Sequence, residues 1–504
     1  MTELPAGESC LDLLSQPLLA VEGPSALNLP QVLAALSRGE NLVFTHLRPH
    51  QQAPWHAFLV QLAYLALEKA AQAEAPQEET DWAGMLLALS DGQPSAWQLC
   101  VDDWQRPAFL QPPCGSGRET DFSDEKIRHS AQSLDLLVAS KNFDEKSHKL
   151  SGFEKDQLDC WIYALVSLQG FAMWGGPTYY NSMRMNSSSA SRSQFRLVFE
   201  RGSGAEFLRD LQILIDRSVD FWSQEEGIGS GRRLPLLWLE KWDDDQLPLA
   251  DVHPLCIEAS RRVRLRREHG FLVMRRAGSK GMRVAANSQH GVVLDPWIPL
   301  TLGKDGVKAA TLQADGLSYR QLAKTVLDRK ECTLPLLARP SDAERRAGLS
   351  ATLVAQVLVG GQSKTDGLRR RELLFPMPVL RALADGDERL AQRSNAFVLL
   401  AKQASTDVLR PALIQFIDGS EKVNLKHADH ARMATPWMER LEAEIDSRFF
   451  TTLFDSVTSE LSDKAAHDVW EDVEQRLHSD WLKQFGQPLR AGAAVKDTAE
   501  DTIT

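Results

Sequence analysis

The residues best suited to chemistry lie between Met173 and Arg192, in a polar segment whose only charges are arginines. The segment contains Gly175 and Gly176, and a glycine without a Cβ lets a partner approach the backbone closely. Asparagines, serines, Arg184 and Arg192 then offer hydrogen-bond donors of the kind that bind phosphates or base edges. We therefore expect a loop that contacts an anionic partner. The alternative is a long solvated loop that binds nothing.

A second basic cluster occupies residues 260–283, where nine arginines and lysines accompany a single acid, Glu268. Arg262 and Arg264 alternate with apolar residues, which predicts a strand with one basic face. Residues 271–276 and 282–285 read as paired strands, and Lys280 lies at the tip of the loop between them. In an acidic protein this concentration of cations favours contact with phosphates over a role in solubility alone.

Two further polar segments are candidates for contact with nucleic acid. The first, residues 141–146, carries both charge signs, and a solvated loop is its default interpretation. The second follows a helix predicted over residues 343–358 and stopped by two glycines. A polar loop placed after a rigid helix and flanked by glycine could be driven between base pairs. The residues singled out in these two segments are Lys141, Asn142 and Lys146, and then Gln362, Ser363, Lys364 and Thr365.

Catalytic and metal-binding patterns are weak. The chain contains no P-loop, G-x-S-x-G, H-E-x-x-H or H-x-E motif. His253 near Cys256 lacks the further ligands that a zinc site requires. The acids at 243–245 could hold a divalent ion in a hydrolase, but three acids in a turn more often lie in solvent. We therefore expect no catalytic residue, no bound metal and no cofactor.

Composition narrows the class of protein. At 504 residues the chain is long enough for two or three domains, and its net charge of -11 argues against unselective coating of nucleic acid. No apolar run reaches the length of a membrane span, and the N-terminus lacks a basic leader region. The six cysteines are scattered without a C-x-x-C pair, which indicates reduced thiols. These features predict a cytoplasmic protein that does not bind membranes.

The elements that must position these residues predict an α+β protein. Helices are expected from Pro30 to Gly39, after Pro54 and around residues 207–215, with short strands between them. The prolines at 376 and 378 mark a domain boundary. Beyond it the pattern is helical, so we predict a large mixed α/β domain over residues 1–374. An up-down four-helix bundle over 375–490 and a disordered tail over 491–504 follow.

Taken in order, these features resemble the CasA family, the large subunit of the type I-E CRISPR interference complex called Cascade. The similarity covers essentially the whole chain. The most specific matches are residues 109–113 (FLQPP), 136–142 (LLVASKN), the glycines at 175–176, residues 257–265 (IEASRRVRL) and 360–367 (GGQSKTDG).

The resemblance implies a non-catalytic subunit that reads the protospacer-adjacent motif on double-stranded DNA, mainly from the minor groove. Gly175-Gly176 is similar to the family's glycine loop and Lys280 to its hairpin lysine, with Arg275 or Arg276 as alternatives to that lysine. Residues 362–367 are similar to the wedge that starts strand separation, after which the guide RNA pairs with the target strand. Arg184, Arg192, Arg262 and Arg264 are expected to contact phosphates.

The same resemblance implies the partners. Residues 141–146 are similar to a loop that docks near the 5′ end of the guide RNA on the backbone subunits. The helical bundle is expected to contact neighbouring subunits and the displaced strand. The other partners are the backbone, small and guide-end subunits, and the large subunit recruits the helicase–nuclease. The family's zinc cysteines are absent except Cys256, so we predict no zinc. Where some members have Asn-Gln-Ala, this chain has Ser363-Lys364-Thr365, and the inserting residue stays open.

Two other functions compete with this one. The chain could be a scaffold that binds protein and guide RNA and leaves DNA contact to its partners. It could also be a metal-dependent hydrolase that uses Asp243, Asp244 and Asp245. Charge reversal at Lys280 and Lys364 separates the first alternative from DNA recognition, and divalent-dependent turnover would identify the second.

Overall fold

A computed structural model describes residues 11–23, 26–122, 130–135, 137–138, 157–186, 191–222, 227–312, 317–361, 364–418 and 428–458. Its contacts divide the chain into two compact units. The first comprises Met1–Gly316, Cys332–Ser341 and Thr352–Glu372, and the second Leu317–Glu331, Asp342–Ala351 and Leu373–Thr504. The mixture of helices and several small sheets confirms the predicted α+β class. That the chain divides into independently folding domains between residues 374 and 375 stays a prediction.

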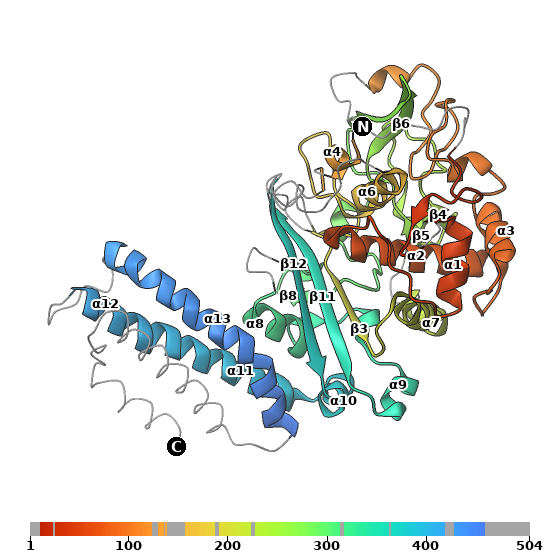
Figure 1. Ribbon diagram of the computed structural model, residues 1–504. Helices are drawn as coiled ribbons and strands as arrows, with labels where there is room; N and C mark the ends of the chain where they lie inside the picture. The colour runs from red at the N-terminus through yellow and green to blue at the C-terminus, as the bar shows by residue number, and fades with distance from the viewer. Residues whose placement is uncertain are drawn as a thin grey trace. The chain divides into compact units, whose positions relative to one another are not determined.

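The α-helices of the first unit all precede its longer strands except β3 in the chain (Figure 1). They are α1 (Leu29–Ser37), α2 (Pro49–Ala70), α3 (Glu79–Leu89), α4 (Ala131–Asp135), α6 (Leu158–Phe171) and α7 (Ser203–Trp222). None of the helices that the structure describes, in either unit, is long and apolar enough to cross a membrane.

The strands that the structure describes form five small sheets rather than one large one. The strands are β1 (Leu19–Ala20), β2 (Ala26–Leu27), β3 (Gln194–Val198), β4 (Leu234–Leu236), β5 (Val252–Ile257), β6 (Arg262–Glu268), β7 (Phe271–Ala277), β8 (Leu300–Gly303), β9 (Gly306–Ala309), β10 (Cys332–Thr333), β11 (Ala351–Gly361) and β12 (Lys364–Phe375). The sheets are β1-β2, β4-β5, β6-β7, β10-β8-β9 and β12-β11-β3, and the strands of the β4-β5 pair are parallel.

Helix α2 is the centre of the first unit and packs against α3, α6, α7 and β5. Most of its side chains are buried, including Trp55, Phe58 and Leu62. The helix predicted to begin at Pro30 is confirmed as the neighbouring α1, and the structure adds a capping residue. Asn28 accepts a hydrogen bond from the Gln31 amide at 2.8 Å, and Pro30 occupies the first turn.

The helix predicted over residues 343–358 is wrong. A short helix, α9 (Asp342–Ala347), ends before Gly348, whose φ of 70° lies in the left-handed region. Residues 351–361 then form β11, which lies between β3 and β12. Because β11 is covered on both faces, its apolar residues do not alternate, and a continuous apolar run cannot be distinguished from a helix by its period.

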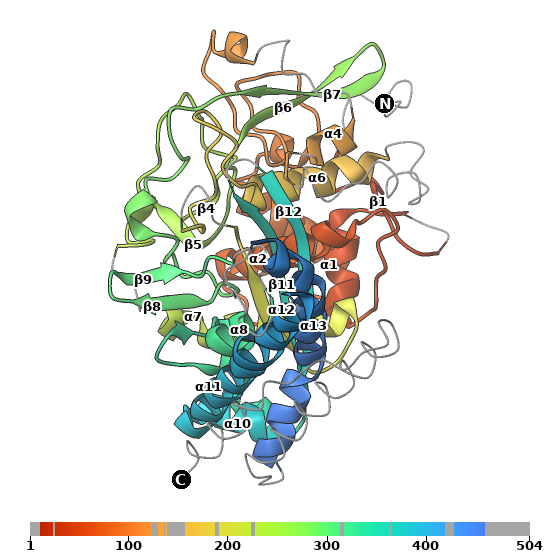
Figure 2. The ribbon, with the colours of Figure 1, turned by 90° about the vertical axis from the view of Figure 1, so that its left-hand side faces the viewer.

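The predicted hairpin around Lys280 is also wrong in its pairing. β7 pairs with the preceding strand β6 along its full length, from Arg262 opposite Ala277 to Glu268 opposite Phe271 (Figure 2). The connecting residues His269 and Gly270 have φ values of 51° and 82°, and two positive φ values are typical of a two-residue hairpin turn. Residues 282–285 instead run beside Leu247, which forms a parallel bridge with Val284.

The second unit is helical, with α8 (Tyr319–Leu322), α9, α10 (Met377–Asp385), α11 (Glu388–Gln403), α12 (Arg410–Asp418) and α13 (Ala428–Thr458). A π-helical turn, η8 (Ala404–Leu409), joins α11 to α12. α13 packs along α11 and α12 (Figures 1 and 2). Arg393, near the start of α11, donates to the Ser456 carbonyl near the end of α13 at 2.7 Å, so α11 and α13 run antiparallel. Helical packing is therefore confirmed, while residues 459–490 of the predicted four-helix bundle lie outside the described residues.

A buried carboxylate fixes the start of α2. Asp135 of α4 accepts hydrogen bonds from Arg48 at 2.8 Å and Gln51 at 3.1 Å, and its other close partner is His50 at 2.8 Å. Burial alone would raise the pKa of Asp135, but His50 and Arg48 outweigh it and lower that pKa below its ordinary value. The cluster therefore stabilises the fold through an ionised aspartate.

A close contact between α7 and the end of α1 makes Gly204 irreplaceable. A Cβ at Gly204 would lie 2.3 Å from the carbonyl carbon of Gly39, a backbone atom that cannot rotate away. We expect Gly204→Ala to lower the free energy of unfolding by about 1–3 kcal/mol in urea denaturation. Gly84→Ala, in the middle of α3 with open space around it, is the control and should be neutral or stabilising. Equal effects of the two changes would contradict the close contact.

The Asp135 cluster predicts a pH dependence. Because the folded-state pKa of Asp135 is lowered, its contribution is complete above the unfolded-state pKa and is lost as pH falls through the folded-state pKa. At pH 7 we expect Asp135→Asn to cost about 3 kcal/mol, since it leaves Arg48 buried without its anion. Urea titrations at pH 7, 5 and 3.5 should show the gap between wild type and variant closing below about pH 4. A gap that is constant with pH would rule out this role.

Candidate nucleic-acid interface

A buried ion network anchors the polar segment that follows α6. Arg184 is 1% exposed, and its Nη1 donates to Glu258 at 2.5 Å. Its Nε lies 3.1 Å from Asp295. Its Nη2 donates to the carbonyls of Pro254 at 2.8 Å and Cys256 at 3.1 Å. Burial opposes the charge of Arg184, but Glu258 outweighs burial and raises its pKa, so the guanidinium stays protonated inside the protein.

Two further groups attach the segment to the same network. The carboxylate of Glu258 also accepts from the Ser182 hydroxyl at 2.5 Å and from the Met183 amide at 3.0 Å. Arg192 donates to Asp295 at 2.9 Å, and its guanidinium lies over the Phe171 ring. The segment is therefore tied to β5 and to Asp295 on both sides of residues 187–190, which lie outside the described residues.

The glycine loop itself is a tight turn. The Gly175 amide donates to the Tyr179 carbonyl at 2.8 Å, and the Tyr179 amide donates to the Gly176 carbonyl at 3.0 Å. Gly176 has a φ of 123°, a conformation that residues with a side chain rarely adopt. Gly175, Pro177 and Thr178 are exposed, so backbone groups of this turn lie at the surface.

The loop that carries Lys280 packs against this glycine turn. The Ser279 amide donates to the Thr178 carbonyl at 3.0 Å. A Cβ at Gly278 would lie 2.8 Å from the Thr178 Cβ, so only glycine allows this approach. The Arg276 guanidinium lies 4.3 Å from the centre of the Tyr179 ring, close enough for a cation–π contact. The structure thus brings together two segments that are about 100 residues apart in the sequence, and it exposes Lys280 beside them.

Buried Arg261 holds the segment that leads into the glycine turn. Its Nη2 donates to the Met173 carbonyl at 2.6 Å, and its backbone amide donates to Gln169 at 2.8 Å. Burial and the nearby Arg276 lower the pKa of Arg261 to about 9. The result is a surface with flexible and backbone donors above a buried positive charge, which suits an anionic polymer whose backbone passes over it.

The basic face predicted on β6 is corrected by the structure. Arg262 lies inside the protein, where it pairs with Asp121 at 2.7 Å and Asp244 at 3.0 Å. Arg264 is equally buried and donates to the carbonyls of Asp103 and Gln111. Burial lowers the pKa of Arg264 to about 10. These guanidiniums join neighbouring segments and are not available to phosphates.

The same correction applies to Arg184 and Arg192, whose guanidiniums belong to the internal network. Arg275 pairs with Glu268 at 2.7 Å, and Arg276 lies over Tyr179. Of the cations predicted to bind DNA in the basic segment, Lys280 is the one that is exposed among the described residues, whereas the others are buried or half-buried.

Several predicted site residues cannot be placed. Lys141, Asn142 and Lys146, together with Gln362 and Ser363, lie outside the described residues. Lys364 and Thr365, which lie within the predicted wedge, begin β12. The wedge therefore lies at the connection of the β11–β12 hairpin, rather than after a helix as predicted.

The acids at 243–245 are engaged by the protein's own donors. Asp243 accepts from the Gly115 amide at 2.7 Å, and Asp244 pairs with Arg118 at 2.7 Å and with Arg262. Among the residues that the structure describes, no group of three or more His, Cys, Asp or Glu side chains is arranged to hold a metal ion.

Sequence reasoning missed the residues that position the loops. Glu258 and Asp295 are single acids with no local pattern, and Thr178 and Gln169 carry no signal of their own. The excess of arginine between residues 261 and 283 does carry information, but it indicates buried arginines that join neighbouring segments more than a basic surface. The number of acids elsewhere in the chain that could pair with those arginines would have suggested that many of them are internal.

The fold is that of CasA proteins. CasA from Thermus thermophilus matches with a TM-score of 0.56 and 14% identity over 98% of each chain. Cse1 from Acidimicrobium ferrooxidans matches with a TM-score of 0.53 and 15% identity over 94% of each chain. Cse1 from Thermobifida fusca matches with a TM-score of 0.55 and 14% identity, over 94% of this chain and 93% of the other. No protein-family model matches this chain, and no curated protein matches it in sequence.

The network around Arg184 predicts a large effect of a small change. Glu258→Gln removes the main anion facing a buried guanidinium, and we expect it to lower the free energy of unfolding by about 3–5 kcal/mol. Glu240→Gln, which removes only the exposed pair with Arg232, should cost less than about 1 kcal/mol. Urea unfolding at neutral pH measures both. If the two variants are equally stable, the network is not what anchors the segment.

Proposed function

We propose that this protein is the large, non-catalytic subunit of an RNA-guided CRISPR complex of the Cascade type. In this role it recognises the protospacer-adjacent motif on double-stranded DNA. The fold similarity to CasA proteins supports the general role. The observation that supports the more specific role, motif recognition, is the contact between the Gly175–Tyr179 turn and the Lys280 loop. These are the two segments that the sequence resemblance links to motif reading.

The mechanism follows from the chemistry of this surface. Lys280 enters the minor groove, where base edges present mainly acceptors and readout is degenerate. The exposed glycine turn lets the DNA backbone approach closely, and the positive charge of Arg261 beneath it favours that approach. The 362–365 segment at the end of the β11–β12 hairpin is inserted below the motif and starts strand separation. Pairing with the guide RNA then reads the remaining sequence.

The proposed partners are the backbone, small and guide-end subunits, the guide RNA, the target duplex and the helicase–nuclease. Residues 141–146 dock near the 5′ end of the guide RNA, and the C-terminal helices contact neighbouring subunits. Because the chain carries a net charge of -11 and its basic segment is largely turned inward, its own DNA affinity is low. The other subunits supply the rest of the positive groove. The complex acts in the cytoplasm of a prokaryote.

Alanine at Lys280 tests motif recognition. In the complex assembled with guide RNA, Lys280→Ala should weaken binding of duplexes with the preferred motif by about 1–3 kcal/mol, roughly 5- to 150-fold. The expected reason is the loss of one groove contact. Fluorescence anisotropy with a duplex library randomised beside a fixed protospacer, at several salt concentrations, measures both affinity and motif preference.

Lys304→Ala is the matched control, because Lys304 is also an exposed lysine on a turn but lies between β8 and β9. It should leave motif preference unchanged. If Lys280→Ala and Lys304→Ala behave alike while the complex still assembles, the chain is a scaffold that leaves DNA readout to its partners.

A further inference from the structure

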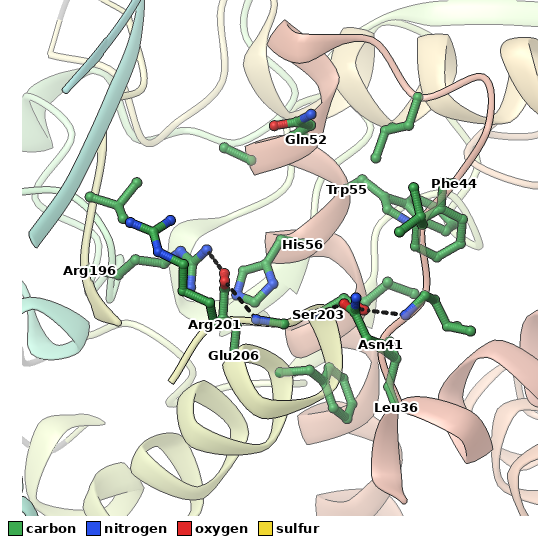
Figure 3. A pocket seen from close by; sticks show the side chains of 18 of the residues that line it. Leu36, Asn41, Phe44, Gln52, Trp55, His56, Arg196, Arg201, Ser203 and Glu206 are labelled. Carbon is green, nitrogen blue, oxygen red and sulfur yellow. Dashed lines mark hydrogen bonds and ion pairs between the residues drawn. The ribbon is translucent and has the colours of Figure 1, made fainter. Parts of the chain in front are cut away.

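A cavity of about 500 Å³ opens in the first unit, well away in sequence from the glycine turn and the Lys280 loop (Figure 3). It is formed by the end of α1, the segment that follows it, the first turns of α2, the start of α7 and the β12-β11-β3 sheet. This volume is typical of sites that bind a small molecule or a short segment of another chain.

The floor of the cavity is apolar. Leu36, Leu59, Phe207 and Val354 line it together with Trp55, which is 2% exposed. An aliphatic or aromatic side chain entering this space would be removed from water, which favours its binding.

Buried donors without partners surround this floor. The Trp55 Nε1 and the Gln194 Nε2 have no hydrogen-bond acceptor among the described residues, and the Arg196 Nη1 has only an ion pair with Asp210 at 3.8 Å. The acceptors nearby are already used: Glu206 binds another nitrogen of Arg196, and Asn41 accepts from the Ser203 amide at 2.9 Å. Since a buried donor without a partner is unfavourable, the cavity is suited to a ligand that brings oxygen acceptors.

The rim carries an excess of positive charge. Arg201 and Arg370, whose side chains are 60% and 36% exposed, both pair with the single carboxylate of Glu372. These two guanidiniums and Glu206 line the same cavity. Two cations that share one anion leave room for a second carboxylate at the entrance.

A nucleobase does not fit this arrangement. One face of the Trp55 ring is stacked on Phe58 at 5.4 Å, and the edges of Phe44 and Tyr163 pack against it at 5.6 and 5.0 Å. The ring therefore offers no free face for the stacking that recognition of single-stranded nucleic acid requires. An aliphatic side chain, main-chain carbonyls and a carboxylate match the floor, the donors and the rim.

We propose that this cavity is a docking site for an acidic peptide segment of a partner protein. One apolar side chain of the segment occupies the floor, its main-chain carbonyls accept from the orphan donors, and a neighbouring carboxylate pairs with Arg201 and Arg370. This site is independent of the proposed DNA recognition, and no residue of the two DNA-facing loops lines it.

The test uses the full chain and fluorescein-labelled octapeptides that hold one leucine or phenylalanine between aspartates and glutamates. Matched peptides with lysines in place of the acids, a single-stranded oligonucleotide and octanoate are the comparison probes. Ala53→Phe, on the partly exposed side of α2, fills the cavity, and Arg370→Glu reverses the rim charge. Arg369→Glu is the control, because neighbouring residues of a strand point to opposite faces and Arg369 does not line the cavity. Thermal melting verifies that each variant is folded.

We expect the acidic peptides to bind, Ala53→Phe to abolish binding, and Arg370→Glu to weaken it at least about tenfold while Arg369→Glu leaves it unchanged. In protein labelled with 5-fluorotryptophan, the ¹⁹F signal assigned through Trp55→Phe should move on addition of peptide. Absence of peptide binding at about 1 mM, the weak end of specific affinities, or equal effects of Arg369→Glu and Arg370→Glu, would overturn the proposal. So would binding of the oligonucleotide or of octanoate alone that depends on the same two variants.

Discussion

The buried guanidinium of Arg184 is the interaction on which the proposed DNA-facing surface depends. It holds together Glu258 at the end of β5, Asp295 and the polar segment after α6. A charge in this position would be very unfavourable alone, because transfer of an ion from water into protein costs several kcal/mol. Here two carboxylates and two carbonyls lie around it, so the buried charge is compensated. The exposed glycine turn is thus anchored to a well-packed interior.

Other arginines of the basic segment are also turned inward and bound by acceptors of the protein itself. Arg262 connects β6 to Asp121 and Asp244, Arg264 connects it to the carbonyls of Asp103 and Gln111, and Arg283 donates to the Glu240 and Lys241 carbonyls. Loops with little secondary structure surround these strands, and arginine can satisfy several of their carbonyls at once because its five donors form a fixed fork. An arginine-rich sequence therefore need not produce an arginine-rich surface.

This use of arginine changes how the protein would meet DNA. With most guanidiniums turned inward, few phosphate contacts come from the described surface, so under the proposed function most of the affinity would come from the other subunits. The glycine turn and the Lys280 loop would then contribute discrimination between DNA motifs rather than overall affinity for DNA. The cavity beside α2 has a different character, because its rim charges are exposed and its floor is apolar. The two sites offer surfaces for two different kinds of partner.

The sequence alone determined the features that are local. Pro30 and Gly39 predict the limits of α1, because a proline and a glycine act within one turn, and the spacing of Trp437, Leu441 and Ile445 predicts α13 because their stripe repeats every turn. The α+β class and the importance of Gly175, Gly176 and Lys280 could also be proposed from the sequence.

Only the tertiary structure decided that residues 351–361 form a strand, since burial on both faces removes the alternation that identifies strands. Likewise, only the folded chain decided which arginines are internal. Arg262 and Lys280 are both cations in a basic segment, and what separates them is the presence of Asp121 and Asp244 beside the first. Those acids come from other parts of the chain, and the cavity around Trp55 is likewise assembled from several separate segments. Local pattern reports backbone preference and amphipathicity, whereas ion pairing and cavities depend on residues that only long-range packing brings together.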